Sequence, residues 1–153
     1  DVDKARARDA KLISDCGGVV TPVPRQDVQP ALTVGLLGSV PHPARGRIFP
    51  QAVILREPNE KVRMDDVYPA GWQIIFAPDV GDEFFQATQG HHLPELLSLK
   101  LGSPELTETE GVLAQWFAEQ GVQAAIVRPD HYIYGVGRSP QEVRTQLQAL
   151  KLV

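Results

Sequence analysis

The sequence predicts an α/β domain in which a mixed central sheet is flanked by helices. Residues 72–77 form an almost unbroken apolar run, as expected of a central strand that is buried on both faces. Residues 122–136 hold two β-branched and aromatic runs on either side of a Pro-Asp pair, which predicts two strands joined by a tight turn. Residues 139–142 then read Ser-Pro-Gln-Glu, a pattern typical of a capped helix start.

The first third of the chain predicts a helix followed by an irregular arm. Residues 2–14 are rich in Ala and Arg, but their apolar stripe is too thin for a helix that stands alone. Residues 21–50 contain six prolines, each of which removes a backbone donor and biases its predecessor to extended geometry. We therefore expect residues 1–50 to form a helix and a Pro-rich arm that wraps over a surface, and residues 51–153 to form the compact domain.

Shorter patterns predict the elements of the compact part. The strand at 96–101 alternates apolar and polar residues, and the helix at 108–120 gathers its apolar residues on one face. The full set comprises strands at 52–55 and 62–64, a helical turn at 65–66, the strand at 72–77, a short helix within 82–90, the strand at 96–101, the helix at 108–120, strands at 122–127 and 131–136, and a helix at 140–150.

The order of elements from residue 72 onward is β-α-β-α-β-β-α. Strands separated by helices imply parallel neighbours, and the final hairpin adds an antiparallel strand. This is the order of a thioredoxin-like core, preceded here by an additional hairpin.

The cysteine pattern predicts that this core has no redox activity. A working thioredoxin needs Cys-x-x-Cys after the first core strand, where a helix N-terminus lowers the thiol pKa. Residues 78–82 read Pro-Asp-Val-Gly-Asp instead, and the single cysteine of the sequence is Cys16, in the arm.

Charge and composition disfavour several classes of partner. The net charge of −4 argues against nucleic acid, which requires a basic surface to neutralise phosphates. No apolar run approaches the roughly 20 residues that span a bilayer, so we predict no membrane association. A lone cysteine suits the reducing cytoplasm, where we expect the protein. The chain begins with Asp1, which favours an excised piece of a longer polypeptide.

Motifs for catalysis and cofactor binding are weak. Gly135 and Gly137 precede a helix as in a dinucleotide-binding loop, but Pro140 takes the place of the third glycine. His91 and His92 lie near acidic residues, yet catalytic zinc usually has three protein ligands, and a solvated loop is the preferred interpretation. We predict no catalytic, cofactor-binding or metal-binding residue in this chain.

Four short segments carry a resemblance to a known family. They read Gly-Arg-Ile-Phe-Pro-Gln at 46–51, Met-Asp-Asp-Val at 64–67, Trp-Gln-Ile-Ile-Phe at 72–76 and Val-Arg-Pro-Asp-His-Tyr-Ile at 127–133. Together they resemble the C-terminal domain of flavin-dependent aromatic-ring hydroxylases, and the 3-(3-hydroxyphenyl)propionate hydroxylase type is the most similar.

The resemblance implies a role for the chain within a larger enzyme. Complete members of the family use FAD, NADH or NADPH, and dioxygen to add a hydroxyl group to a phenolic ring. Their FAD fingerprint and substrate pocket belong to the N-terminal part, and neither is present in this sequence. The chain would thus be an accessory, thioredoxin-like domain that packs against the FAD and substrate domains of the same polypeptide, with residues 1–50 as the linker, and that contributes to a homodimer interface.

The turn of the final hairpin supplies the candidate interdomain anchor, which consists of Arg128, Asp130 and Tyr132. A turn that is polar at its tip can bond a neighbouring backbone, although an internal role in bracing the hairpin is an equal alternative. His131 stands where many relatives have Gly. We also expect the apolar residues of the arm to lie on the domain's own core or on a partner chain; these are Leu32, Val34, Leu36, Leu37 and Val40.

Two alternative functions remain open at this point. The first is a free-standing, redox-inactive thioredoxin-like module that binds a peptide or another protein. The second is an enzyme in its own right that uses His91, His92 or His131 with nearby carboxylates, which would require these groups to converge in a concave pocket.

Overall fold

The computed structural model of the chain describes residues 2–18, 30–56, 60–68, 70–90, 93 and 95–150. The chain divides into two compact units, Asp1–Pro30 and Ala31–Val153. In the first unit, helix α1 (Val2–Asp15) forms where the sequence predicts a helix. Gly17 ends it with a φ of +65°, and the amide of Gly18 donates to the carbonyl of Ile13 at 2.8 Å, a common helix terminus for glycine.

The second unit is built on a four-stranded mixed sheet, as predicted. The strands run in the order β4-β3-β5-β6. Strand β3 pairs parallel to β4 and antiparallel to β5, and β5 pairs antiparallel to β6. The strands are β3 (Gln73–Phe76), β4 (Leu97–Lys100), β5 (Ala124–Val127) and β6 (Ile133–Gly137).

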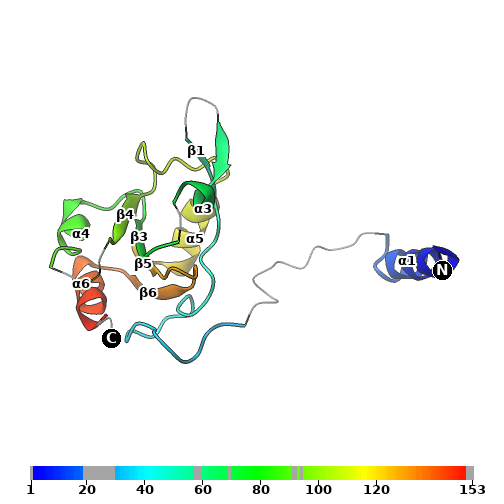
Figure 1. Cartoon of the computed structure of the whole chain (residues 1–153), viewed down its shortest axis with the longest axis horizontal. Coiled ribbons are helices and arrows are strands. Elements are labelled where there is room, and N and C mark those ends of the chain that lie inside the picture. The colour runs from blue at the N-terminus through cyan, green and yellow to red at the C-terminus, as the bar shows by residue number, and fades with distance from the viewer. Residues whose placement is uncertain are drawn as a thin grey trace. The chain divides into compact units, whose positions relative to one another are not determined.

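Helices cover both faces of this sheet. Helices α4 and α6 contact each other and lie on one side of it, and α5 lies on the other side (Figure 1). Their bounds are α4 (Asp82–Gln86), α5 (Val112–Gln120) and α6 (Pro140–Ala149). The predicted order β-α-β-α-β-β-α from residue 72 onward is confirmed, while the thioredoxin-like label stays a prediction.

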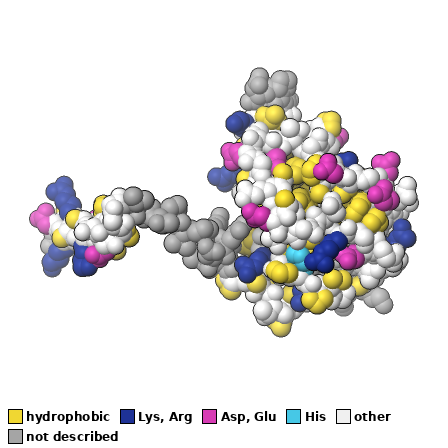
Figure 2. Space-filling view, turned by 180° about the vertical axis from the view of Figure 1, so that it is seen from behind, with side chains coloured by type: hydrophobic (Ala, Val, Ile, Leu, Met, Phe, Trp, Pro, Cys, Tyr) yellow, Lys and Arg dark blue, Asp and Glu magenta, His cyan; other side chains and the backbone are white. Residues whose placement is uncertain are grey.

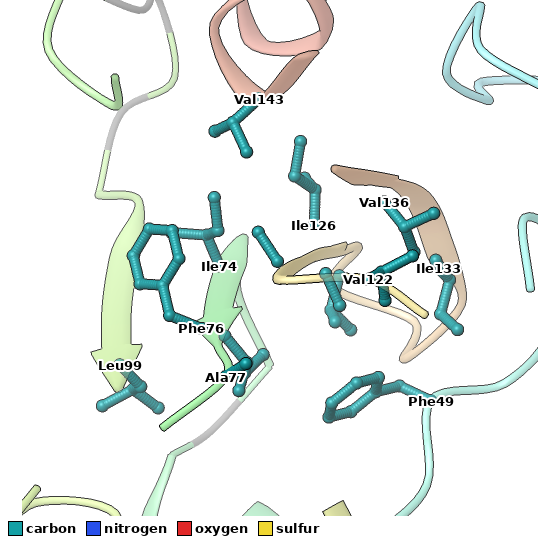
Figure 3. Close-up of a cluster of buried hydrophobic side chains, with 14 of the residues drawn as sticks. Phe49, Ile74, Phe76, Ala77, Leu99, Val122, Ile126, Ile133, Val136 and Val143 are labelled. Carbon is teal, nitrogen blue, oxygen red and sulfur yellow. The ribbon is translucent and has the colours of Figure 1, made fainter. Parts of the chain in front are cut away.

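Because helices cover both faces of the sheet, its central strands form the hydrophobic core. All four residues of β3 and all four of β5 are buried, which is the burial expected of the continuous apolar runs in the sequence. Figure 3 shows Ile74 and Phe76 of β3 with Ile126 of β5 and Val143 of α6 in one cluster of buried side chains. These residues hold α6 against the sheet.

A small hairpin precedes the sheet, also as predicted. Strands β1 (Val53–Leu55) and β2 (Lys61–Arg63) pair antiparallel, and the short helix α3 (Met64–Val67) follows. The turn predicted at 57–60 lies largely outside the described residues.

Helix α5 is shorter than the sequence indicates. The predicted helix 108–120 begins at Val112, because Gly111 adopts a φ of +71°. The carboxylate of Glu108 folds back and accepts hydrogen bonds from the amides of Leu113 and Ala114, at 2.8 and 2.9 Å. Glu108 thus caps the helix from outside instead of forming its first turn.

The second half of the arm belongs to the compact unit. The amides of Gly38 and Gly46 donate to the carbonyls of Tyr134 and Ile133 in β6, at 2.8 and 2.9 Å. The arm therefore follows the β6 edge, and the compact unit begins at Ala31 rather than near residue 51. The role of residues 1–50 as an interdomain linker stays a prediction. Across the described ranges, no helix combines the length and the apolar content that crossing a bilayer requires.

Candidate functional site

The β5–β6 turn brings the three candidate anchor residues together. The Nε and Nη2 atoms of Arg128 donate to the two carboxylate oxygens of Asp130, at 3.1 and 2.7 Å. The Arg128 side chain is only 19% exposed, against 49% for Asp130. The amide of Tyr132 lies 3.4 Å from Asp130 Oδ1, and its carbonyl accepts the Arg128 amide at 2.9 Å. Such a two-point pair holds the guanidinium in one orientation.

The remaining guanidinium nitrogen of Arg128 reaches the arm. Arg128 Nη1 donates to the carbonyl of Leu36 at 2.8 Å, across 92 residues of sequence. Tyr132 also forms an isolated β-bridge with Ile48. These contacts of the anchor residues lie within this chain, and they hold the arm against the hairpin. They support the alternative role of the three residues, which is to brace the hairpin. The interdomain role stays a prediction.

His131 adopts an uncommon backbone conformation in the same turn. Its φ of +64° lies in the left-handed region that glycine favours. Its Nδ1 lies 3.6 Å from Asp65 Oδ1, and the other oxygen of Asp65 accepts from Gln51 Nε2 at 2.8 Å. Sequence reasoning missed this cluster, because nothing local relates His131 to residues so far away along the chain.

Residues 33–36 form a protrusion that we call the apolar tip. Val34 is 82% exposed and Leu36 is 44% exposed, while Leu32 and Leu37 on either side are half-buried. Within this chain, Val34 and Leu36 thus do not lie on the domain's own core, which leaves a partner as the other predicted location. Val40 is half-buried.

The glycine loop before α6 is filled by the helix itself. A Cβ placed on Gly135 would lie 1.7 Å from Gln146 Oε1, and one on Gly137 would lie 2.7 Å from a Val143 methyl group. The first amides of α6 have partners too, since those of Glu142 and Val143 donate to the hydroxyl and the carbonyl of Ser139, at 3.3 and 3.2 Å. This close packing explains the glycines without a phosphate ligand.

The other candidate residues are dispersed or outside the described part. His91 and His92 lie among the residues that the structure leaves undescribed, and Cys16 is exposed in the first unit. Among the described residues, no group of three His, Cys, Asp or Glu side chains is placed to hold a metal ion. Acidic and basic side chains are intermixed on the face that Figure 2 shows.

His42 is the described histidine whose titration the fold changes. Burial lowers its pKa from the usual 6.5, and a backbone hydrogen bond involving Gln120 acts in the opposite direction. Its Nδ1 accepts the amide of Ala44 at 3.1 Å, which requires that nitrogen to be unprotonated. His42 therefore serves as a neutral acceptor that shapes the arm.

The chain is similar to a described domain family and to two curated hydroxylases. Residues 79–152 match the family described as the HcaD C-terminal domain. A probable NADH-specific resorcinol 4-hydroxylase of Rhodococcus jostii (strain RHA1) is 30% identical over 94% of this chain and 27% of its own length. A 3-(3-hydroxy-phenyl)propionate/3-hydroxycinnamic acid hydroxylase of Klebsiella pneumoniae (strain 342) is 28% identical over 94% of this chain and 24% of its own length.

Solved structures show the same fold. The flavin-dependent monooxygenase PieE, in complex with FAD and substrate, aligns with a TM-score of 0.55 at 19% identity, over 78% of this chain and 24% of that one. RebC-10x, native and K252c-bound, aligns with a TM-score of 0.50 at 15% identity, over 96% of this chain and 28% of that one.

The matched share of each relative is small. The chain spans about a quarter of the length of the curated hydroxylases that it matches, whereas almost all of the chain is aligned. Nearly all of the chain is therefore similar to about a quarter of these two aromatic hydroxylases, and residues 79–152 match a domain described as C-terminal.

Proposed function

We propose that this chain is the accessory, structural domain of an FAD-dependent monooxygenase that hydroxylates a phenolic ring with NADH or NADPH and dioxygen. The observation that carries the proposal is the alignment of 94% of the chain with only 27% of the resorcinol 4-hydroxylase. The larger unmatched part of such a polypeptide would hold FAD, the nicotinamide cofactor and the ring substrate.

The names of the relatives support this division of roles. One relative is named an NADH-specific hydroxylase, and PieE, which shares this fold, was crystallised with FAD and substrate. What the chain itself offers is a closely packed sheet and an arm fixed along its β6 edge. Such a body suits packing against other domains of the same polypeptide.

Three further assignments belong to the same proposal. Arg128, Asp130 and Tyr132 would anchor the arm so that it presents a fixed surface to the neighbouring domains. The complete enzyme would act in the cytoplasm, and the domain would contribute to a homodimer interface. The strand order β4-β3-β5-β6, with β3 parallel to β4, supports the assignment of a thioredoxin-like fold.

The test uses the complete polypeptide that contains this chain. We expect the purified protein to show the absorbance bands of bound flavin, to release FAD on heating, and to oxidise NADH or NADPH faster when a phenolic compound is added. Mass spectrometry should then find a product heavier by one oxygen atom. A complete polypeptide that carries no flavin would contradict the proposal and favour the free-standing interaction module.

A further inference from the structure

Among the residues that the structure describes, the exposed large apolar side chains all lie within positions 2–36. From β1 onward, the described residues leave no large apolar side chain in this exposed class. Single exposed apolar residues scattered over a surface are ordinary, whereas exposed apolar residues that lie close together mark a contact surface. Val2, Leu12 and Ile13 belong to the first unit, whereas Val34 and Leu36 are the exposed pair of the second unit.

The apolar tip is held rigidly although its side chains point away from the core. On one side, the amide of Leu32 donates to the carbonyl of Gly46 at 2.7 Å. On the other, Arg128 bonds the carbonyl of Leu36, and the amide of Gly38 bonds β6. A protrusion whose backbone is fixed before binding loses little conformational entropy when it binds, which favours association.

We propose that the apolar tip, residues 33–36, is a docking element that inserts Val34 and Leu36 into the flavin- and substrate-binding part of the same polypeptide. This inference rests on the proposed function and names the surface through which the accessory domain acts. Arg128 is a positioning residue in this arrangement, because it holds the Leu36 carbonyl and so sets the direction of the tip.

The partner of the tip is either another part of the same polypeptide or a second copy of the chain, and covalent linkage favours the first. A stable interface between separate proteins buries roughly 800 Å² on each partner, far more than two side chains supply. A neighbour in the same polypeptide is present at a high effective concentration, so that a small apolar contact suffices. The resorcinol 4-hydroxylase has almost three quarters of its length outside the matched region, so a polypeptide of that kind holds a large tethered neighbour.

The test measures hydrogen exchange by mass spectrometry in the complete polypeptide. The variants are Val34→Asp combined with Leu36→Asp, Val34→Asp alone, and Thr145→Asp as the matched control, because Thr145 is an exposed residue of α6. In the part of the chain that the structure describes, the amides of residues 33–36 donate no hydrogen bond. Without a docking partner they should therefore exchange close to the rate of an unprotected amide.

The proposal expects protection of the tip in the wild-type polypeptide and in the Thr145→Asp control. Their tip amides should exchange at least tenfold more slowly than those of the double variant, with Val34→Asp alone in between. The amides of β3 and β5 should stay protected in every variant, which shows that the domain remains folded. Equal tip exchange in the wild type and the double variant would overturn the proposal.

Flavin absorbance of the same samples separates this inference from the proposed function. Bound flavin together with an unprotected tip would leave the proposed function standing and refute the docking element. A protected tip in a polypeptide without flavin would refute both, because the covering partner would then not be a flavin-binding part.

Discussion

The backbone conformation of His131 is determined by the β5–β6 turn. Pro129 and Asp130 occupy the central positions, and the amide of His131 donates to the carbonyl of Arg128 at 2.9 Å. To return the chain to β6, His131 must then take a φ of +64°. For a residue with a Cβ, this conformation costs about 1–2 kcal/mol.

Replacing this residue tests the cost directly. We expect His131→Gly to be more stable than His131→Ala by about 1 kcal/mol, because both lose the imidazole near Asp65 but only glycine relieves the backbone. Chemical denaturation of the two variants measures the difference. A His131→Ala protein that is the more stable of the two would show that the turn does not hold this conformation.

His42 gives the domain a predictable pH dependence. Because burial lowers the pKa of His42 in the folded state, folding favours the neutral imidazole more than the unfolded chain does. This contribution to stability is complete above the usual value of 6.5 and is lost as the pH falls through the lowered folded value.

The measurement is the free energy of unfolding at about pH 7.5 and about pH 5.5. We expect the wild-type protein to lose more stability on acidification than His42→Gln, which keeps an acceptor for the Ala44 amide but does not titrate. An identical loss in both proteins would mean that His42 is protonated equally in the folded and unfolded states.

At the scale of elements, helix α6 is the clearest product of local sequence. The Ser139 hydroxyl accepts from the Glu142 amide at 3.3 Å, and Pro140 occupies the first turn, as the Ser-Pro-x-Glu pattern predicts. The Glu142 carboxylate departs from that pattern in one respect, because it accepts from Arg138 rather than from Ser139.

This cap can be removed with a known cost. We expect Ser139→Ala to lower the free energy of unfolding by about 1 kcal/mol, since one amide at the helix start loses its acceptor. Ser139→Asp is the control, because its carboxylate can cap and also interacts favourably with the helix N-terminus. Denaturant titration would contradict this account if the Ala and Asp variants were equally stable.

The arm depends on a contact that no local pattern reveals. Arg128 is bonded to both Asp130 and the Leu36 carbonyl. We expect Arg128→Ala to lower the free energy of unfolding by about 1–3 kcal/mol, because charge-assisted hydrogen bonds are lost at a largely buried group. Hydrogen exchange at the Gly38 amide should also accelerate, whereas unchanged exchange there would show that Arg128 does not fasten the arm.

These elements explain which parts of the structure the sequence predicts. The order of elements along the chain, the hairpins and α6 depend on apolar runs, turns and caps that act within a few residues, and they were predictable. The late start of α5 at Val112, the His131–Asp65 pair and the Arg128–Leu36 bond depend on groups that meet through tertiary folding. The exposure of Val34 could be measured only once the arm was placed along β6.

At the scale of the whole molecule, the chain is similar over 94% of its length to about a quarter of two larger hydroxylases. The sequence alone indicated a resemblance to aromatic-ring hydroxylases through four short segments; the curated relatives align over 94% of the chain, and the family model matches residues 79–152. The central claim that follows is a division of labour, in which the flavin is bound outside this domain.

The most direct test titrates FAD into this chain and, in parallel, into the complete polypeptide. Binding is monitored by the absorbance of the flavin. The account predicts saturable binding by the complete polypeptide and none by the chain alone. Saturable, stoichiometric FAD binding by the chain alone would contradict it.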